Sequence, residues 1–196
     1  MPQLTQIKET KKGRMALFLD GEFAFSLDAD TFAQADLHEE DLLEEWQIED
    51  LRKQSDTRRA LDKAMDYLSL RDHAAGELYQ KLCRKFDEHS AAYAVARAGE
   101  LGLLNDADFA RRRAAELLRK RKSRREILLD LTAKGIDRDT AAEADDGEDP
   151  ELANARALVE RHYAAKLAAG KRDQVAAALA RRGFSHSVIR AALAEN

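Results

Sequence analysis

The stretch SRREILLDLTAKGI, residues 123–136, decides the fold of this chain, because it holds every signal of one short helix. Ser123 and Glu126 have the spacing of a capping box, in which each side chain bonds the backbone N–H of the other residue. Ile127 and the leucine four residues later share one helix face. Gly135 can end the helix, because glycine adopts the left-handed conformation without a steric penalty. The stretch therefore predicts a helix of roughly 11 residues with one buried face.

The same pattern recurs along the chain. Three segments carry it, at offsets of 49 and 48 residues: Glu77-Leu78-x-x-x-Leu82, Glu126-Ile127-x-x-x-Leu131 and Gln174-Val175-x-x-x-Leu179. The second and third copies close with Lys134-Gly135-Ile136 and Arg182-Gly183-Phe184, whereas the first has Lys85-Phe86 and no glycine. Such a period is typical of helical repeat arrays. We therefore expect a mainly α fold of three tandem three-helix repeats in an elongated array, with Ile136 and Phe184 folded back on the helices they follow.

Composition agrees with a helical protein. Charged residues make up 36% of the chain, and it has only 9 glycines and 2 prolines, fewer than a turn-rich β fold would need. The N-terminal segment is the exception. Asp20-Gly21 lies between the alternating run Met15, Leu17, Leu19 and the run Phe23-Ala24-Phe25, which is a strong hairpin signal. We predict a small N-terminal β-hairpin or three-stranded meander that packs on the following helices.

The next segment should be helical in two pieces. Leu42, Leu43, Trp46 and Leu51 suit a short acidic helix, and Trp46 is expected to anchor the core. Ser55-Asp56-Thr57 supplies residues that start a second helix. Further on, the acidic stretch 143–150 contains glycine and proline and is the expected hinge. The predicted domains are residues 1–54, 55–105, 106–148 and 149–196.

A search for catalytic chemistry finds no pattern that supports an enzyme. No histidine pairs with another histidine, cysteine or carboxylate at metal spacing, and no phosphate-binding glycine loop is present. We therefore expect no catalytic residue, no metal site and no cofactor. The single Cys83 excludes an internal disulfide and suggests a reducing compartment, where it would be a small core residue. Without a long apolar run or a signal peptide, the chain is expected to be cytoplasmic and free of membrane contact.

The distinctive surface feature is a basic run. Nine of the fifteen residues from 111 to 125 are basic, although the whole chain has a net charge of −4. On one helix over residues 107–121, Ala110, Ala114, Leu117 and Leu118 would form a buried arc opposite the basic side chains. The candidate partner contacts are Arg111, Arg112, Arg113, Arg119, Lys120, Lys122, Arg124 and Arg125. Two interpretations stay open: a solvated face balanced by acidic neighbours, or a contact with an acidic protein surface or with phosphates.

Four motifs carry a resemblance to a known family. They are Tyr67-Leu68-x-x-Arg71 upstream of Glu77-Leu78, the run Leu101-Gly-Leu-Leu-Asn-Asp-Ala-Asp-Phe-Ala110, Lys134-Gly135-Ile136 and Arg182-Gly183-Phe184. Together they resemble the RecX family over residues 57–196. The resemblance implies a non-catalytic, monomeric regulator of recombination, DNA repair and the SOS response. Its partner would be the RecA–DNA filament, whose strand exchange and ATPase it commonly inhibits, and it would meet single-stranded DNA only within that filament.

Two departures and two alternatives accompany this interpretation. Ala74 stands where the family often has a serine cap, and the glycine before Phe86 is missing, so the ends of the first middle helix are open to question. One alternative is a stand-alone helical DNA-binding protein that uses the basic helix 107–125. The other is a helical scaffold for an unrelated protein. The acidic N-terminal segment predicts stronger binding to the filament than to bare DNA.

Overall fold

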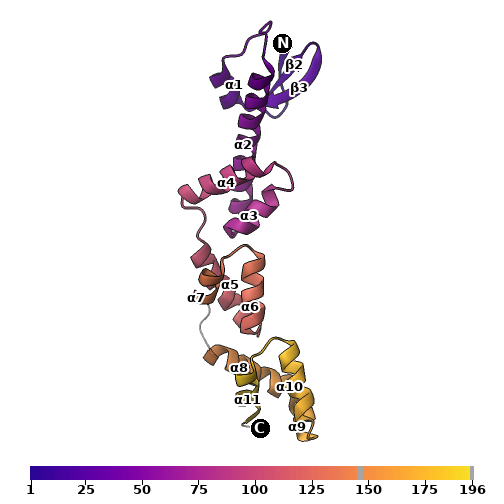
Figure 1. The fold of residues 1–196 in the computed structure, drawn as a ribbon, viewed down its shortest axis with the longest axis vertical. Coiled ribbons are helices and arrows are strands. Elements are labelled where there is room, and N and C mark those ends of the chain that lie inside the picture. The colour runs from indigo at the N-terminus through magenta and orange to yellow at the C-terminus, as the bar shows by residue number, and fades with distance from the viewer. Residues whose placement is uncertain (145–147, 195–196) are drawn as a thin grey trace. The chain divides into compact units, whose positions relative to one another are not determined.

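The computed structural model describes residues 1–144 and 148–194, and the side chains of all of these except residues 148 and 149. The chain is mainly helical with one small N-terminal sheet, which confirms the predicted fold class (Figure 1). It divides into two compact units. Unit 1 contains Met1–Arg71 and Leu78–Leu103, and unit 2 contains Asp72–Glu77 and Leu104–Asn196.

The sheet in unit 1 is the predicted meander. β1 (Leu4–Glu9), β2 (Met15–Leu19) and β3 (Glu22–Leu27) are antiparallel in the order β1-β2-β3. Asp20 and Gly21 have φ of 51° and 87°, so both turn residues adopt the left-handed conformation that the Asp-Gly pair predicts. Leu4, Leu17 and Leu27 are buried with Leu51 of the long helix α2 (Glu45–Leu70). The sheet therefore gains its stability from packing on that helix.

The predicted helix start at Ser55-Asp56-Thr57 is wrong. After α1 (Ala29–Ala35), α2 runs without a break from Glu45 to Leu70, a length of 26 residues. Ser55 is buried within it, where its hydroxyl donates to the carbonyl of Ser26 at 3.1 Å and accepts from Arg14 at 2.8 Å. Because β3 and Arg14 satisfy this hydroxyl, it does not cap a helix end and α2 continues.

Trp46 is not the core anchor that the sequence suggested. Its side chain is 64% exposed, and its indole N–H donates to the carboxylate of Glu44 at 2.6 Å. The reason is the helix phase. A capping box between Glu44 and Gln47 starts α2, so the face that turns inward carries Ile48 and Leu51. Leu42, grouped with these residues in the sequence, is also exposed, whereas Leu43 is buried.

The remaining helices form successive groups. In unit 1, α2 packs on α4 (Glu88–Glu100). The helix α3 (Ala75–Leu82) has its first three residues in unit 2 and buries Leu78 and Leu82 in unit 1. In unit 2, α5 (Asp106–Arg119), α6 (Arg124–Ala133) and α7 (Arg138–Glu143) share one core. A second core joins α8 (Glu148–Leu158), the π-helix η1 (Val159–Tyr163), α10 (Arg172–Arg181) and α11 (His186–Ala194), and α9 (Ala164–Ala168) lies between η1 and α10.

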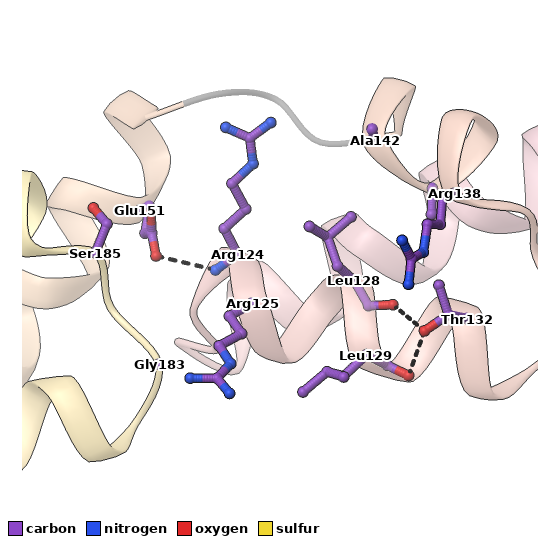
Figure 2. Close-up of a pocket in the computed structure, with 11 residues that line it drawn as sticks. Arg124, Arg125, Leu128, Leu129, Thr132, Arg138, Ala142, Glu151, Gly183 and Ser185 are labelled. Carbon is purple, nitrogen blue, oxygen red and sulfur yellow. Dashed lines mark hydrogen bonds between the residues drawn. The ribbon is translucent and has the colours of Figure 1, made fainter.

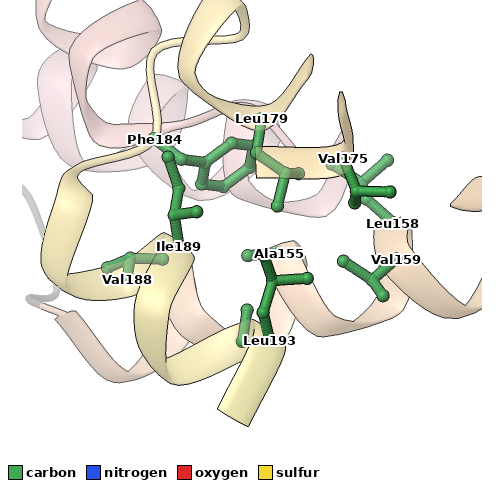
Figure 3. Close-up of a cluster of buried hydrophobic side chains, with 10 residues drawn as sticks. Ala155, Leu158, Val159, Val175, Leu179, Phe184, Val188, Ile189 and Leu193 are labelled. Carbon is green, nitrogen blue, oxygen red and sulfur yellow. The ribbon is translucent and has the colours of Figure 1, made fainter. Parts of the chain in front are cut away.

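The ends of the middle helices follow the predicted glycine signal. Gly135 and Gly183 have φ of 81° and 87°. The next residue folds back in both cases: Ile136 donates to the carbonyl of Leu131 at 3.1 Å, and Phe184 to that of Leu179 at 3.3 Å. Figure 3 shows Phe184 among the buried side chains of the last group. Without a glycine, Phe86 bonds the carbonyl only four residues back, at Leu82. The first copy thus ends in a turn that is one residue shorter.

The family-like run 101–110 has a clear structural role. Gly102 ends α4 with φ of 71°, and Leu103 donates to the carbonyl of Ala98. Asn105 then caps α5 by accepting the N–H of Asp108 at 2.9 Å. The run therefore encodes one helix stop and the next helix start.

The predicted domain boundaries stay predictions, and α2 crosses the one between residues 54 and 55. The predicted hinge at 143–150 lies partly outside the described residues.

Candidate functional site

The basic run does not form one continuous helix, so the expected helices over 107–121 and 107–125 are wrong. α5 ends at Arg119, and α6 begins at Arg124. Arg121 adopts the left-handed conformation with φ of 58°, and the N–H of Lys122 bonds the carbonyl of Leu117. The physical cause is the capping box of Ser123 and Glu126, which starts a new helix at this point. The basic side chains therefore spread over the end of α5, a turn and the start of α6.

The apolar arc of α5 is as predicted. Ala110, Ala114 and Leu117 are buried, and Leu118 packs beside them against α6 and α7. The opposite side of α5 carries the arginines. The helix thus buries one face and presents a charged one, even though it is shorter than expected.

Arg113 is held inside the unit. Its guanidinium donates to both carboxylate oxygens of Asp130 on α6 at 2.8 Å and to Glu116 at 2.8 Å. This bidentate pairing raises the pKa of Arg113 and lowers the pKa of Asp130. Hydrogen bonds from Lys120 and Arg113 lower the pKa of Glu116 from 4.5 to about 2. The side chain of Arg113 is only 26% exposed, so it joins α5 to α6.

Four further basic side chains also have acidic neighbours. Arg111 pairs with Asp108 at 3.1 Å and Lys122 with Glu126 at 2.9 Å, while Arg112 pairs with Asp108 and Asp72 and Lys120 with Glu116. The interpretation of a balanced charged face therefore describes these residues. Their pairs are exposed, however, and such pairs contribute only about 0–1 kcal/mol. A partner with negative charge can replace them at little cost.

The unpaired cations lie around the turn between the two helices. Within the described residues, no ion pair joins Arg119, Arg121 or Arg125. The backbone N–H of Arg124 donates to the buried carboxylate of Glu151 at 3.1 Å, while its side chain belongs to the exposed start of α6. Arg121 lies in the same basic run but was not among the predicted contacts. That prediction assumed one continuous helix, whereas Arg121 lies in a turn and has a left-handed backbone conformation.

The described part of the chain offers neither a metal cluster nor a helix that could span a membrane. No cluster of three or more histidine, cysteine, aspartate or glutamate side chains there could hold a metal ion. None of the helices described is both long and apolar enough to cross a membrane.

Fold and surface together define the class: a mainly helical protein built from successive helix groups, with basic side chains around the turn between α5 and α6. Family models described as the first and second three-helix domains of RecX match residues 60–97 and 105–144. The regulatory protein RecX of Bacillus subtilis strain 168 is 30% identical over 207 residues, covering 98% of this chain and 76% of the relative. That of Bacillus licheniformis is 30% identical over 209 residues, covering 100% and 78%.

The chain therefore belongs to the RecX family. Its relatives are named regulatory proteins, which confirms the prediction of a non-catalytic protein. Two solved structures show the same fold. A crystal structure of regulatory protein RecX has a TM-score of 0.69 at 22% identity, covering 96% of this chain and 97% of the other. RecX from Lactobacillus salivarius has a TM-score of 0.65 at 22% identity, covering 71% and 96%.

Proposed function

We propose that this chain binds the RecA recombinase filament and inhibits its strand exchange and ATPase activity. Membership in the RecX family, by similarity along the whole chain, is the observation that carries the proposal. We expect the protein to act as a cytoplasmic monomer without a cofactor.

The contact surface that we propose is the basic run without Arg113. Arg113 is not part of this surface, because its guanidinium already donates hydrogen bonds to Asp130 and Glu116. Arg119 and Arg125 are exposed and make no ion pair within the described residues, so they can meet a negative partner directly. The exposed pairs of Arg111, Arg112, Lys120 and Lys122 can exchange partners. The cationic side chain of Arg124 completes the surface.

Charge distribution favours the nucleoprotein filament over bare DNA. Residues 1–56 carry 6 basic and 14 acidic side chains, which repel a free phosphate backbone. Residues 57–142 carry 19 basic and 14 acidic side chains, so attraction is confined to the middle of the chain. We therefore propose that single-stranded DNA is met only within the filament.

The test is RecA ATPase on single-stranded DNA with increasing amounts of the protein. The wild type should lower the rate, and the variant R112E/R119E/K120E should need about tenfold more protein for the same effect. The matched control is K11E/K12E/R84E, which reverses three exposed charges elsewhere and should behave as the wild type. An unchanged rate, or equal losses in both variants, would contradict the proposal. A higher rate would contradict inhibition.

The stand-alone DNA-binding alternative has its own measurement. Labelled single-stranded DNA, bare or coated with RecA, is titrated with the protein at one salt concentration. Tighter binding to the coated strand supports the proposal. Equal or tighter binding to the bare strand would favour the alternative, in spite of the interrupted basic helix.

A further inference from the structure

A groove lies between α6 and α7 in unit 2 and has a volume of about 440 Å³. Leu128 and Leu129 on α6 and Ala141 and Ala142 on α7 supply its apolar lining, and Glu151, Gly183 and Ser185 of the last helix group line it as well. Figure 2 shows the two leucines on α6 between Arg125 and Arg138. The volume falls in the range of natural ligand pockets, roughly 300–1,000 Å³. The groove is therefore large enough for apolar side chains of a partner.

Thr132 and Glu151 add little polarity to the lining, because their polar groups are hydrogen-bonded to the backbone. The hydroxyl of Thr132 donates back to the carbonyls of Leu128 and Leu129 at 2.8 and 3.2 Å, so its methyl group remains for contact. The carboxylate of Glu151 accepts the backbone N–H of Arg124 at 3.1 Å and is buried. Leu129 is 59% exposed and continues this apolar lining to the surface. The exposed Leu129 is therefore part of a continuous apolar surface and is not an isolated apolar side chain.

The same groove occurs again in the last helix group. Between α10 and α11 a groove of about 390 Å³ is lined by the counterparts of the first. Eight positions of the first lining return 48 residues later in the second, among them Leu129 as Ala177 and Arg138 as His186. Two helix groups therefore keep the same face hollow, which makes the groove a property of the repeated unit.

Charge at the rim of both grooves is positive. Arg125 and Arg138 border the first, and Arg172 and Arg190 border the second, with Asp173 as the acidic residue of the second lining. Within the described residues none of these four arginines makes an ion pair. An apolar floor with a cationic rim complements an acidic peptide that carries a large apolar side chain.

Nucleic acid is a poorer match for these grooves. Among the described residues that line them there is no phenylalanine, tyrosine or tryptophan, so bases lack the stacking platform that these rings provide. Phosphates would use the arginines but leave the leucine and alanine surface exposed to water. The combination of exposed apolar area and unpaired arginines therefore favours a protein segment.

The geometry points to a docking site in each groove for an acidic peptide segment of a protein partner, with an apolar side chain inserted between the two helices. This inference deepens the proposed function, on which it rests for the protein nature of the partner. The groove of α6 and α7 should dominate, because Leu128 and Leu129 are partly exposed, whereas Ile189 and Leu193 in the other lining are buried. The partner's acidic residues would lie against Arg125 and Arg138.

The test uses a labelled synthetic peptide in which glutamates flank a central leucine and phenylalanine. Fluorescence anisotropy at low salt follows its binding to the full-length chain. The wild type should bind it saturably, and L129E/R138E should bind about tenfold more weakly. The matched control L70E/R84E changes another exposed leucine and arginine and should bind as the wild type. Circular dichroism checks that both variants remain folded.

Two further titrations separate the possible occupants. A peptide with serines in place of the leucine and phenylalanine should bind about tenfold more weakly, and equal binding would overturn the apolar part of the proposal. A single-stranded oligonucleotide that outcompetes the peptide and is lost in L129E/R138E would assign the groove to nucleic acid and overturn it. No saturable peptide binding would also overturn it. RecA is absent from these titrations, so their failure is distinct from a failure of the ATPase test.

Discussion

The helices α3 and α6 start in different ways at equivalent places in the repeat. α6 begins with Ser123, whose hydroxyl accepts the N–H of Glu126 at 3.3 Å. α3 follows Ala74, which has no hydroxyl. Its first N–H, at Ala75, donates to the carboxylate of Asp106 on α5 at 2.8 Å. A helix start needs acceptors for its free N–H groups, and they can come from another helix.

Both starts share two contacts with the helix group that follows. We call them the first joint (α3 with Asp106 and Gly135) and the second joint (α6 with Glu151 and Gly183). A carboxylate accepts the first helical N–H in each, and a glycine approaches the helix start in each. In the first joint that glycine meets another glycine, Gly76; in the second it meets Ser123. The serine hydroxyl also donates to the carbonyl of Arg182 at 2.7 Å.

The difference explains the departure at Ala74. Where α6 is preceded by Ser123, α3 is preceded by a buried alanine that packs in the core of α5, α6 and α7. Asp106 corresponds to Glu151 and not to Ser123, because each of the two carboxylates accepts the first helical N–H. The space that a side chain would fill is closed by Gly76 against Gly135. The two joints thus have the same packing arrangement but are built from different residues. Variants of their glycines and of their carboxylates distinguish the two joints.

The largest effect is expected from alanine at the joint glycines. A Cβ at Gly135 would lie 2.6 Å from the Cα of Gly76, at a φ of +81°. Gly135→Ala should lower the free energy of unfolding by about 3 kcal/mol, because a backbone contact and an unfavourable φ combine. At Gly183 the nearest atom is the side-chain oxygen of Ser123 at 2.8 Å, so Gly183→Ala should cost about 2 kcal/mol. Urea titration measures both.

The control for the glycine series is Gly170→Ala. This glycine has a φ of +71° with nothing within 4 Å of an added Cβ. It should therefore show the backbone effect alone, about 1 kcal/mol. Equal losses at all three positions would mean that the close approach in the joints is not needed.

A smaller effect is expected from the two joint carboxylates. Glu151→Ala should lower the free energy of unfolding by about 2 kcal/mol, because the Glu151 side chain is buried (2% exposed) and the N–H of Arg124 loses its acceptor. Asp106→Ala should cost about 1 kcal/mol, since Asp106 is only half-buried and water can replace it. Thermal unfolding of both variants ranks them. Exposed Glu160→Ala is the control and should be nearly neutral. A reversed order would argue that the second joint is the weaker one.

The smallest effect is the dependence of stability on low pH. It comes from ion pairs on α5 and α6, and not from the joints. Glu116 has a pKa of about 2 instead of 4.5, through hydrogen bonds from Lys120 and Arg113. A carboxylate with a lowered pKa stabilises the fold above its unfolded value and loses that contribution as the pH falls through its folded value. Arg113→Gln should therefore be less stable than the wild type at neutral pH. The difference should close as the pH falls from 4.5 to about 2.

Urea titrations at several pH values follow this difference. Arg59→Gln, which breaks an exposed pair with Asp56, is the control and should differ little from the wild type at any pH. A wild-type advantage over Arg113→Gln that persists unchanged at pH 2 would show that packing, not charge, is the role of Arg113.

Local signals accounted for much of the fold. The Asp-Gly hairpin, the Ser123 capping box and the glycines that end α6 and α10 all lie where their patterns place them. Errors arose where a distant contact overruled a local signal. Ser55 is a helix-start residue by type, but its hydroxyl is satisfied by β3 and Arg14. Trp46 is large and apolar, yet the phase of α2 turns it outward.

Only part of the candidate surface could be predicted from the sequence. The basic run and its buried arc could be found by counting charges and helical phase. The capping-box residues Ser123 and Glu126 indicate a new helix start and so a break near Arg121. The prediction of one helix through the whole basic run did not take this signal into account. The pairing of Arg113 with Asp130 could not be predicted, because it depends on how α5 packs against α6.

The sequence by itself determined the helical period, the helix stops and the cationic run, because each depends on neighbours within one or two turns of the chain. Only the tertiary structure decided which cations are paired, how α3 is capped by Asp106, and where the grooves beside α6 and α10 lie. Those features join residues from separate helices. Their energies depend on distance in space, which local sequence patterns do not specify.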